Sequence, residues 1–214
     1  GIDNIFESGL GKGMDVNDEV FLSLGAKSAS REACLSQSDV LMSTSPIAVN
    51  EISAMKDQAL FLGLMEPFSN KEQFSAFQLN NVSAVSMEFI PRITRAQKMD
   101  VLSSQSNLAG YVAVIESAKE LKAALPMMMT AAGTLKPATV FVIGVGVAGL
   151  QAIATAKRLG AKVEAFDTRP VVEDQVKSGG AKFVKLDVGD TGHTEHGYAN
   201  ELTKEQIQLQ KICK

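Results

Sequence analysis

Residue types that usually define a small cross-linked or metal-bound fold are nearly missing from this sequence. Its 214 residues include no tryptophan, two cysteines and two histidines. Cys34 and Cys213 lie far apart with no metal-ligand spacing, which favours a reducing compartment, and Cys34 is predicted to be a small buried hydrophobe. His193 and His196 fall in a polar, glycine-containing segment, where two solvated histidines are expected rather than a metal site. We therefore expect no metal.

A strong charge of one sign is lacking as well. The formal net charge is −3 and no basic block occurs, so nucleic acid is not an expected partner. No signal peptide opens the sequence. Residues 137–156 carry no charge, but three closely spaced glycines and the closing Lys157 and Arg158 favour a soluble turn over a membrane helix. We expect no direct membrane insertion. The hydrophobic content of 45% supports one large or two small domains.

The most informative stretch covers residues 138–169. An apolar run, Thr139–Ile143, has the composition of a strand buried on both faces. Gly144, Gly146 and Gly149 follow as G-x-G-x-x-G. The first permits a tight turn, the second lets a pyrophosphate approach the backbone, and the third lets helix and strand pack closely.

The segments after the glycines complete a strand–helix–strand unit. A helix is predicted over residues 150–159 and a second strand over Lys162–Phe166, with Gly160 between them. The N-terminus of the helix would point free N–H groups at phosphates. Asp167 follows about 20 residues after the turn, where a carboxylate can accept both ribose hydroxyls. The predicted dinucleotide site comprises Gly144, Gly146, Val147, Ala148, Gly149, Asp167, Thr168 and Arg169.

The choice between NAD and NADP depends on two neighbouring charges. Asp167 favours NAD, because a carboxylate repels a 2′-phosphate. Arg169 could accept that phosphate, or it could point to solvent or to the pyrophosphate. We predict NAD(H).

Strands and helices also alternate elsewhere in the chain. Strands are predicted in the first residues and at 40–42, 59–64, 82–87 and 182–186; helices are predicted at 15–24, 30–37, 50–56, 70–79 and 170–177. This alternation predicts an α/β fold with two Rossmann-like parallel-sheet lobes joined by a long helix. We place the domains at residues 1–100 and 126–214, with the helix at 101–125 between them. The second lobe is expected to be incomplete, because only the first half of a Rossmann unit is present.

Residues 88–100 form a polar segment that differs from both lobes. It is interrupted by Pro91 and carries Arg92, Gln97 and Asp100, followed by Ser103. Alone, such a segment is as well explained by a solvated connector with surface ion pairs; beside a dinucleotide turn it favours a site. The helix at 101–125 is predicted to bury one apolar stripe, and Met127–Met129 are predicted to pack in the core; the stripe comprises Leu108, Tyr111, Ile115 and Ala118.

Three stretches resemble a known family. They are RITRAQKMDVLSSQSNLAGY at 92–111, PMMMTAAGT at 126–134 and GVGVAGLQAIATAKRLGAKVEAFDTRP at 144–170. They are similar to the NAD(H)-binding domain I, or alpha subunit, of proton-translocating NAD(P) transhydrogenase, in the alanine dehydrogenase/transhydrogenase family. The resemblance covers roughly residues 5–210 and is most specific between 88 and 184. Because the family's chain continues past both ends, this sequence is expected to be truncated at both.

The resemblance implies a reaction and its partners. Domain I holds NAD(H), a separate domain III holds NADP(H), and hydride passes directly between the two nicotinamides. Membrane domain II couples this transfer to proton movement. The family also implies a homodimer, bound peripherally at the cytoplasmic or matrix face of an energy-coupling membrane. Such a transfer needs no acid or base, only donor and acceptor carbons held in contact in a dry site.

The resemblance also implies roles for single residues. Arg92, Gln97, Asp100 and Ser103 match the family's residues that orient the nicotinamide carboxamide and its ribose, with Gln97 reaching the second cofactor. Tyr198 matches a mobile-loop tyrosine that folds over bound NAD(H), although the loop around it is shorter and richer in charge than the family's. Lys98 stands where a small polar residue is expected.

Two alternatives have different chemistry. Alanine dehydrogenases use a lysine and a histidine after two strands of the N-terminal domain; here VLMSTSP at 40–46 and LFLGLMEP at 60–67 contain neither, which disfavours that activity. A non-catalytic NAD-binding module would keep the glycine turn and Asp167. It would have no reason to keep Arg92, Gln97, Asp100 and Ser103 together.

Overall fold

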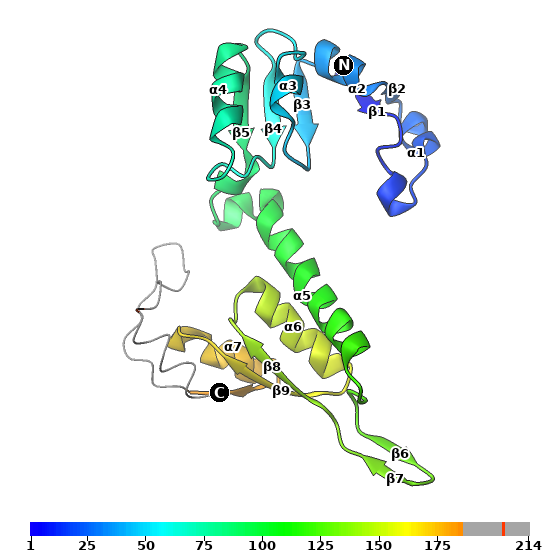
Figure 1. The fold of residues 1–214 in the computed structure, drawn as a ribbon, viewed down its shortest axis with the longest axis vertical. Coiled ribbons are helices and arrows are strands. Elements are labelled where there is room, and N and C mark those ends of the chain that lie inside the picture. The colour runs from blue at the N-terminus through cyan, green and yellow to red at the C-terminus, as the bar shows by residue number, and fades with distance from the viewer. Residues whose placement is uncertain (186–202, 204–214) are drawn as a thin grey trace. The chain divides into compact units, whose positions relative to one another are not determined.

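The chain divides into two compact units. In this computed structural model, which describes residues 1–185 and Thr203, the first unit covers residues 1–100 and the second covers 101–214. Each unit is described by itself (Figure 1). The predicted loop around Tyr198, with His193, His196 and Cys213, lies outside the described residues.

The first unit is built on parallel strands. β3 (Val40–Ser43), β4 (Leu60–Gly63) and β5 (Ser83–Ser86) form one sheet in that order, and β1 (Ile5–Glu7) pairs in parallel with β2 (Lys27–Ala29). The predicted strands of the larger sheet are confirmed, while β2 was not predicted: its three residues carry no apolar run. The core beside β4 consists of Leu35, Ile47, Ile52, Met55, Ala59, Phe61, Met65, Ala76, Phe77 and Val82.

Short helices connect these strands. They are η1 (Lys12–Met14), α1 (Asp18–Ser23), α2 (Arg31–Gln37), α3 (Val49–Ile52) and α4 (Lys71–Leu79). Ser30 caps α2 through a bond from the Ala33 N–H, at 3.2 Å. The predicted helix start at Asp15 is wrong: Asp15 ends η1 in a left-handed conformation with φ of 53°, and α1 begins at Asp18.

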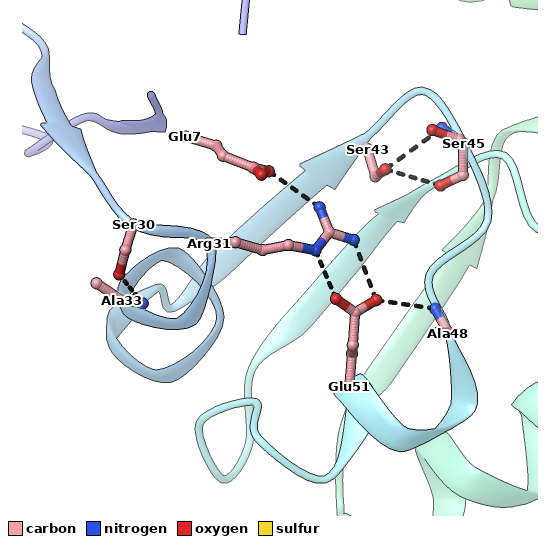
Figure 2. A network of polar contacts seen from close by, with 8 residues as sticks. All are labelled: Glu7, Ser30, Arg31, Ala33, Ser43, Ser45, Ala48 and Glu51. Carbon is pink, nitrogen blue, oxygen red and sulfur yellow. Dashed lines mark hydrogen bonds and ion pairs between the residues drawn. The ribbon is translucent and has the colours of Figure 1, made fainter. Parts of the chain in front are cut away.

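One arginine links the smaller sheet to α3, as Figure 2 shows. Arg31, at the start of α2, donates to Glu7 at the end of β1 at 2.9 Å and to Glu51 in α3 through Nε and a terminal nitrogen. Glu51 also accepts the Ala48 N–H at 3.1 Å. These bonds hold the pKa of Glu51 below its usual range, because the Arg31 guanidinium outweighs the effect of burial. Cys34, one turn along α2, is buried as predicted.

The second unit contains the predicted strand–helix–strand unit. β8 (Thr139–Ile143) and β9 (Lys162–Phe166) lie where the sequence predicts them, and α6 (Val147–Arg158) begins three residues before the predicted start at residue 150. β9 is the middle strand of a parallel sheet ordered β10-β9-β8. β10 (Lys182–Phe183) follows η4 (Pro170–Val172) and α7 (Glu173–Ser178). The core of this unit gathers around Ile153, Ala156, Ala165 and Val176.

The long helix α5 (Val101–Glu120) belongs to the second unit and packs along α6 (Figure 1). It ends at Glu120 rather than at the predicted residue 125; Leu125, beyond its end, enters the core and accepts the Ala138 N–H at 3.1 Å. The predicted stripe is also wrong in part. Gly110 and Val114 face the core, while Leu108 and Tyr111 are exposed.

The three consecutive methionines do not pack in the core as predicted. They open a two-stranded antiparallel hairpin of β6 (Met128–Thr130) and β7 (Gly133–Leu135), which extends away from the sheet of the second unit (Figure 1). Met127 is 62% exposed and Met129 is 84% exposed. The prediction failed because Met128 and Met129 pair with β7 across the turn at Gly133, whose φ of 127° favours glycine.

Candidate dinucleotide site

The presence of glycine at each of the three positions of the turn has a different physical explanation. Gly144 has φ of 89°, which favours glycine, and its N–H donates to the Phe166 carbonyl at 2.8 Å. A Cβ on Gly149 would lie 1.9 Å from the Gly144 carbonyl oxygen, so only glycine permits this approach of helix and turn. A Cβ on Gly146 would meet nothing within 4 Å. Packing within the described residues therefore does not require glycine at 146, whereas a ligand lying on its backbone would.

The start of α6 is open in the same place. Gly146 is the N-cap of α6 and provides no side chain to satisfy the first N–H groups of the helix, which belong to Val147 and Ala148. These groups and the positive end of the helix dipole suit a pyrophosphate. Gly110 of α5 supports this turn, since a Cβ there would lie 2.1 Å from the Ala148 carbonyl oxygen.

Asp167 is buried at the end of β9 and is bound to the glycine turn. One carboxylate oxygen accepts the Val145 N–H at 2.7 Å, and the other accepts the Arg169 N–H at 2.8 Å. The Arg169 guanidinium donates to both oxygens, each at 2.9 Å, and to the Val145 carbonyl at 3.2 Å. The predicted Gly144 turn, Asp167 and Arg169 are thus brought together in one cluster.

Hydrogen bonding keeps this cluster charged. Burial acts to raise the pKa of Asp167, but the bonds from the Arg169 guanidinium and from two backbone N–H groups outweigh it and leave the pKa below its usual range. The same pairing raises the pKa of Arg169. Asp167 is therefore an anion at neutral pH, as a ligand for ribose hydroxyls must be to accept both. Thr168, between them, is half-buried.

The polar segment before α5 is partly helical. It contains two 3₁₀ helices, η2 (Met87–Phe89) and η3 (Thr94–Met99), with Ala96 buried beneath the second. Gln97 is exposed on η3, and its carbonyl accepts the Asp100 N–H at 3.3 Å. Arg92, Gln97 and Asp100 belong to the first unit, while Ser103 lies in the first turn of α5 in the second.

Glu88 holds the beginning of this segment in place. Its carboxylate accepts the Met65 and Glu66 N–H groups, each at 2.8 Å, and the Ser86 hydroxyl at 2.6 Å. Burial acts to raise the pKa of Glu88, but these bonds keep it below its usual range. Sequence reasoning did not identify Glu88. The available signal was an acid immediately after a predicted strand.

Two further properties of the described residues bear on the site. None of their helices combines the length and the apolar character needed to cross a membrane. Within the same part of the chain, no group of three His, Cys, Asp or Glu residues is placed to hold a metal ion.

Known sequences match the chain along nearly its whole length. The family described as Alanine dehydrogenase/PNT, N-terminal domain, matches residues 1–109, and its C-terminal counterpart matches residues 113–214. A Rhodospirillum rubrum protein described as a portion of NAD(P) transhydrogenase subunit alpha is 46% identical over 213 residues, covering 96% of this chain and 56% of that protein. NAD(P) transhydrogenase subunit alpha of Haemophilus influenzae is 40% identical, covering 96% of this chain and 40% of that protein.

Solved structures give the same result for the fold. A transhydrogenase from Sinorhizobium meliloti superposes with a TM-score of 0.84 and 48% identity, covering 88% of this chain and 56% of that one. An L-alanine dehydrogenase superposes with a TM-score of 0.73 and 20% identity, covering 85% and 51%, which is a likeness of fold. The chain spans about half the length of these proteins or less.

Proposed function

The chain belongs to the alanine dehydrogenase/PNT family over both halves of its length, and we propose that it is the NAD(H)-binding component of a proton-translocating NAD(P) transhydrogenase. The single observation that carries this proposal is the open turn at Gly146, above an ionised Asp167. Similarity to transhydrogenase alpha subunits in both units supports it.

The second unit holds NAD(H) in this proposal. The backbone at Gly146 and the first N–H groups of α6 bind the pyrophosphate, while Asp167 accepts the hydroxyls of the adenosine ribose. A 2′-phosphate beside an ionised Asp167 is repelled, which favours NAD(H) over NADP(H).

The polar segment orients the reacting half of the cofactor. Bound NAD(H) supplies the nicotinamide carbon that gives or receives hydride. Arg92, Asp100 and Ser103 fix the carboxamide and ribose of that half, and Gln97 reaches toward the second nucleotide. No proton moves to or from these side chains. Their contribution is to hold the ring in position and to keep water out.

The partners follow from the same proposal. An NADP(H)-binding domain III exchanges hydride with this chain, and a membrane domain II couples the exchange to proton translocation. The chain acts at the cytoplasmic or matrix face of the membrane and forms a homodimer. The β6–β7 hairpin supports the homodimer, because an isolated two-stranded hairpin is marginally stable in water and this one exposes Met128 and Met129.

Oxidative deamination of alanine is the weaker candidate. Neither lysine nor histidine occurs in the segments directly after β3 and β4, where that activity would need them. Ser43 at the end of β3 uses its hydroxyl within its own turn, donating to the Ser45 carbonyl at 2.7 Å (Figure 2). Leu64 follows β4. Neither can polarise a substrate carbonyl or accept its proton.

Titration of the intact protein with NADH and NADPH tests the cofactor assignment. We expect NADH to bind more tightly, and Asp167→Ala to weaken NADH binding by about 1–3 kcal/mol, the scale for losing hydrogen bonds to a charged group. The substitution should also reduce the difference in affinity between NADH and NADPH. Equal affinity of the parent for both nucleotides, or an unchanged preference in the variant, contradicts the role given to Asp167.

A further inference from the structure

Arg169 occupies the acceptor positions that a ribose would need. A carboxylate offers about four lone-pair directions. In Asp167 two are taken by the backbone N–H groups of Val145 and Arg169, and the guanidinium of Arg169 donates to both oxygens as well. The acceptor capacity of Asp167 is therefore filled before any nucleotide arrives.

The backbone N–H donors and the guanidinium donor differ in how easily they can move away from the Asp167 carboxylate. The N–H groups of Val145 and Arg169 are fixed by the turn, and removing their acceptor would leave backbone donors unpaired. The guanidinium is carried by a flexible side chain, and its own side chain is 17% exposed against 5% for Asp167. Ribose hydroxyls are donors too, so they can replace the guanidinium at the carboxylate.

We propose that Arg169 acts as a latch, meaning a side chain that must leave Asp167 before the adenosine ribose can bind there. Its charge also lowers the preference of this site for NAD(H) over NADP(H). This inference rests on the proposed NAD(H) function. Arg169 competes with the ribose hydroxyls for Asp167, which lowers the affinity for NAD(H). Its charge also offsets that of Asp167 and remains within one side-chain length of the ribose, where it reduces the repulsion of a 2′-phosphate.

The test measures the ratio of the dissociation constants for NADPH and NADH in the intact protein. Because the sequence has no tryptophan, nucleotide fluorescence can be followed without protein background from that residue. Arg169→Gln should raise the ratio by about tenfold, the effect of removing one unit charge near the 2′-phosphate at intermediate effective dielectric. An unchanged or lower ratio overturns the proposal.

Arg169→Lys is the second variant and separates charge from geometry. A lysine keeps the charge but lacks the planar fork that holds both oxygens. The ratio should stay within about threefold of the parent's, while NADH should bind about threefold more tightly because the latch is weaker. Weaker or unchanged NADH binding by this variant overturns the latch even if Arg169→Gln does not fold.

A control removes the same charge elsewhere. Lys177 on α7 pairs with Glu173 at 2.8 Å, so Lys177→Gln changes net charge equally and should leave the ratio unchanged. If Arg169 had a purely structural role, its substitution would weaken the binding of NADH and NADPH alike and leave the ratio of their dissociation constants unchanged. If the parent binds no NADH, both the latch and the proposed function fail. If it binds NADH but the ratio does not respond to Arg169→Gln, only the latch fails.

Discussion

Two carboxylates, Glu88 and Asp167, have the same physical role in different units. Each accepts backbone N–H groups from a neighbouring loop, and each is kept ionised by those bonds against the effect of burial. Glu88 binds the N–H of Glu66, which has a left-handed φ of 49° that is unfavourable for a non-glycine residue. The loop after β4 therefore depends on Glu88 for its conformation.

Glu88→Gln tests this dependence. The glutamine keeps one acceptor but loses the charge that strengthens the three bonds, so we expect the free energy of unfolding at neutral pH to fall by about 1–2 kcal/mol. Chemical denaturation of parent and variant gives the difference. Glu72→Gln on α4 is the control, because Glu72 is exposed. Equal losses from both substitutions would mean that Glu88 is an ordinary surface acid.

The pH dependence of the same variant has a definite sign. The folded-state pKa of Glu88 is below its ordinary value of about 4.3, so its stabilisation is fully present above that pH and is lost as the pH falls through the folded-state pKa. The difference in unfolding free energy between parent and variant should therefore shrink from neutral pH toward about pH 3. A difference that is constant over this range would contradict the assignment.

Single residues differ in how well their structural roles can be predicted from the sequence. The glycines were identifiable because their spacing reports a backbone turn, which is local in the chain. Asp167 was identifiable because it directly follows the second strand of the same strand–helix–strand unit. The contact of Arg169 with Val145 was not, since it joins residues in different elements. The roles of Arg92, Gln97, Asp100 and Ser103 stay predictions that rest on resemblance.

At the level of elements, the strands were predictable where they are continuous and apolar. β4 and β9 are the middle strands of their described sheets, and their runs of apolar residues mark them. β8 has a similar run, but it is the end strand of its described sheet and exposes alternate residues, so the predicted burial on both faces is wrong. β2, β6 and β7 were missed because each has three residues and little buried surface. The buried face of α5 was misjudged for a different reason. Its contact depends on a glycine, and periodicity in apolar residues gives glycine no weight.

Gly110→Ala tests the packing of α5 on α6. Alanine favours a helix by about 1 kcal/mol over glycine, but here its Cβ would lie 2.1 Å from the Ala148 carbonyl oxygen. Because backbone must move, we expect a net loss of about 1–3 kcal/mol of stability. The shift would also disturb the first turn of α6, so NADH affinity should fall. Gly13→Ala, where a Cβ meets nothing within 4 Å, is the control for thermal unfolding. A stabilised Gly110→Ala variant would contradict the close packing.

At the scale of the whole molecule, a substitution in the β6–β7 hairpin tests the proposed homodimer. Met129 is 84% exposed on β6, so Met129→Glu should be tolerated by the fold yet place a charge in the proposed contact. Sedimentation of the intact protein should show a dimer for the parent and a shift toward monomer for the variant, by about tenfold or more in dissociation constant. Met14→Glu, at a residue 73% exposed in the first unit, should leave the dimer intact. A monomeric parent removes the homodimer from the proposal.

Gln97 separates a transhydrogenase component from a module that only binds NAD. In the proposed function the second unit holds the adenosine half of the cofactor through Gly146, α6 and Asp167, whereas Gln97 is exposed on η3 of the first unit. An interaction made chiefly when both nucleotides are present should affect hydride transfer far more than binding. Its effect therefore appears only when the protein is combined with its NADP(H)-binding partner.

Gln97→Asn shortens the side chain by one methylene and keeps the amide. NADH binding should remain close to that of the parent, while hydride transfer from NADPH to an NAD analogue should fall by about one to two powers of ten, because misplacement by about 1 Å costs on the order of 100-fold. Stopped-flow transfer and NADH titration measure the two quantities on one preparation. Gln78→Asn, on the exposed face of α4, is the matched control and should transfer hydride at the parent rate. If Gln97→Asn does the same, the segment before α5 is only a connector, and the enzymatic role must lie elsewhere in the chain.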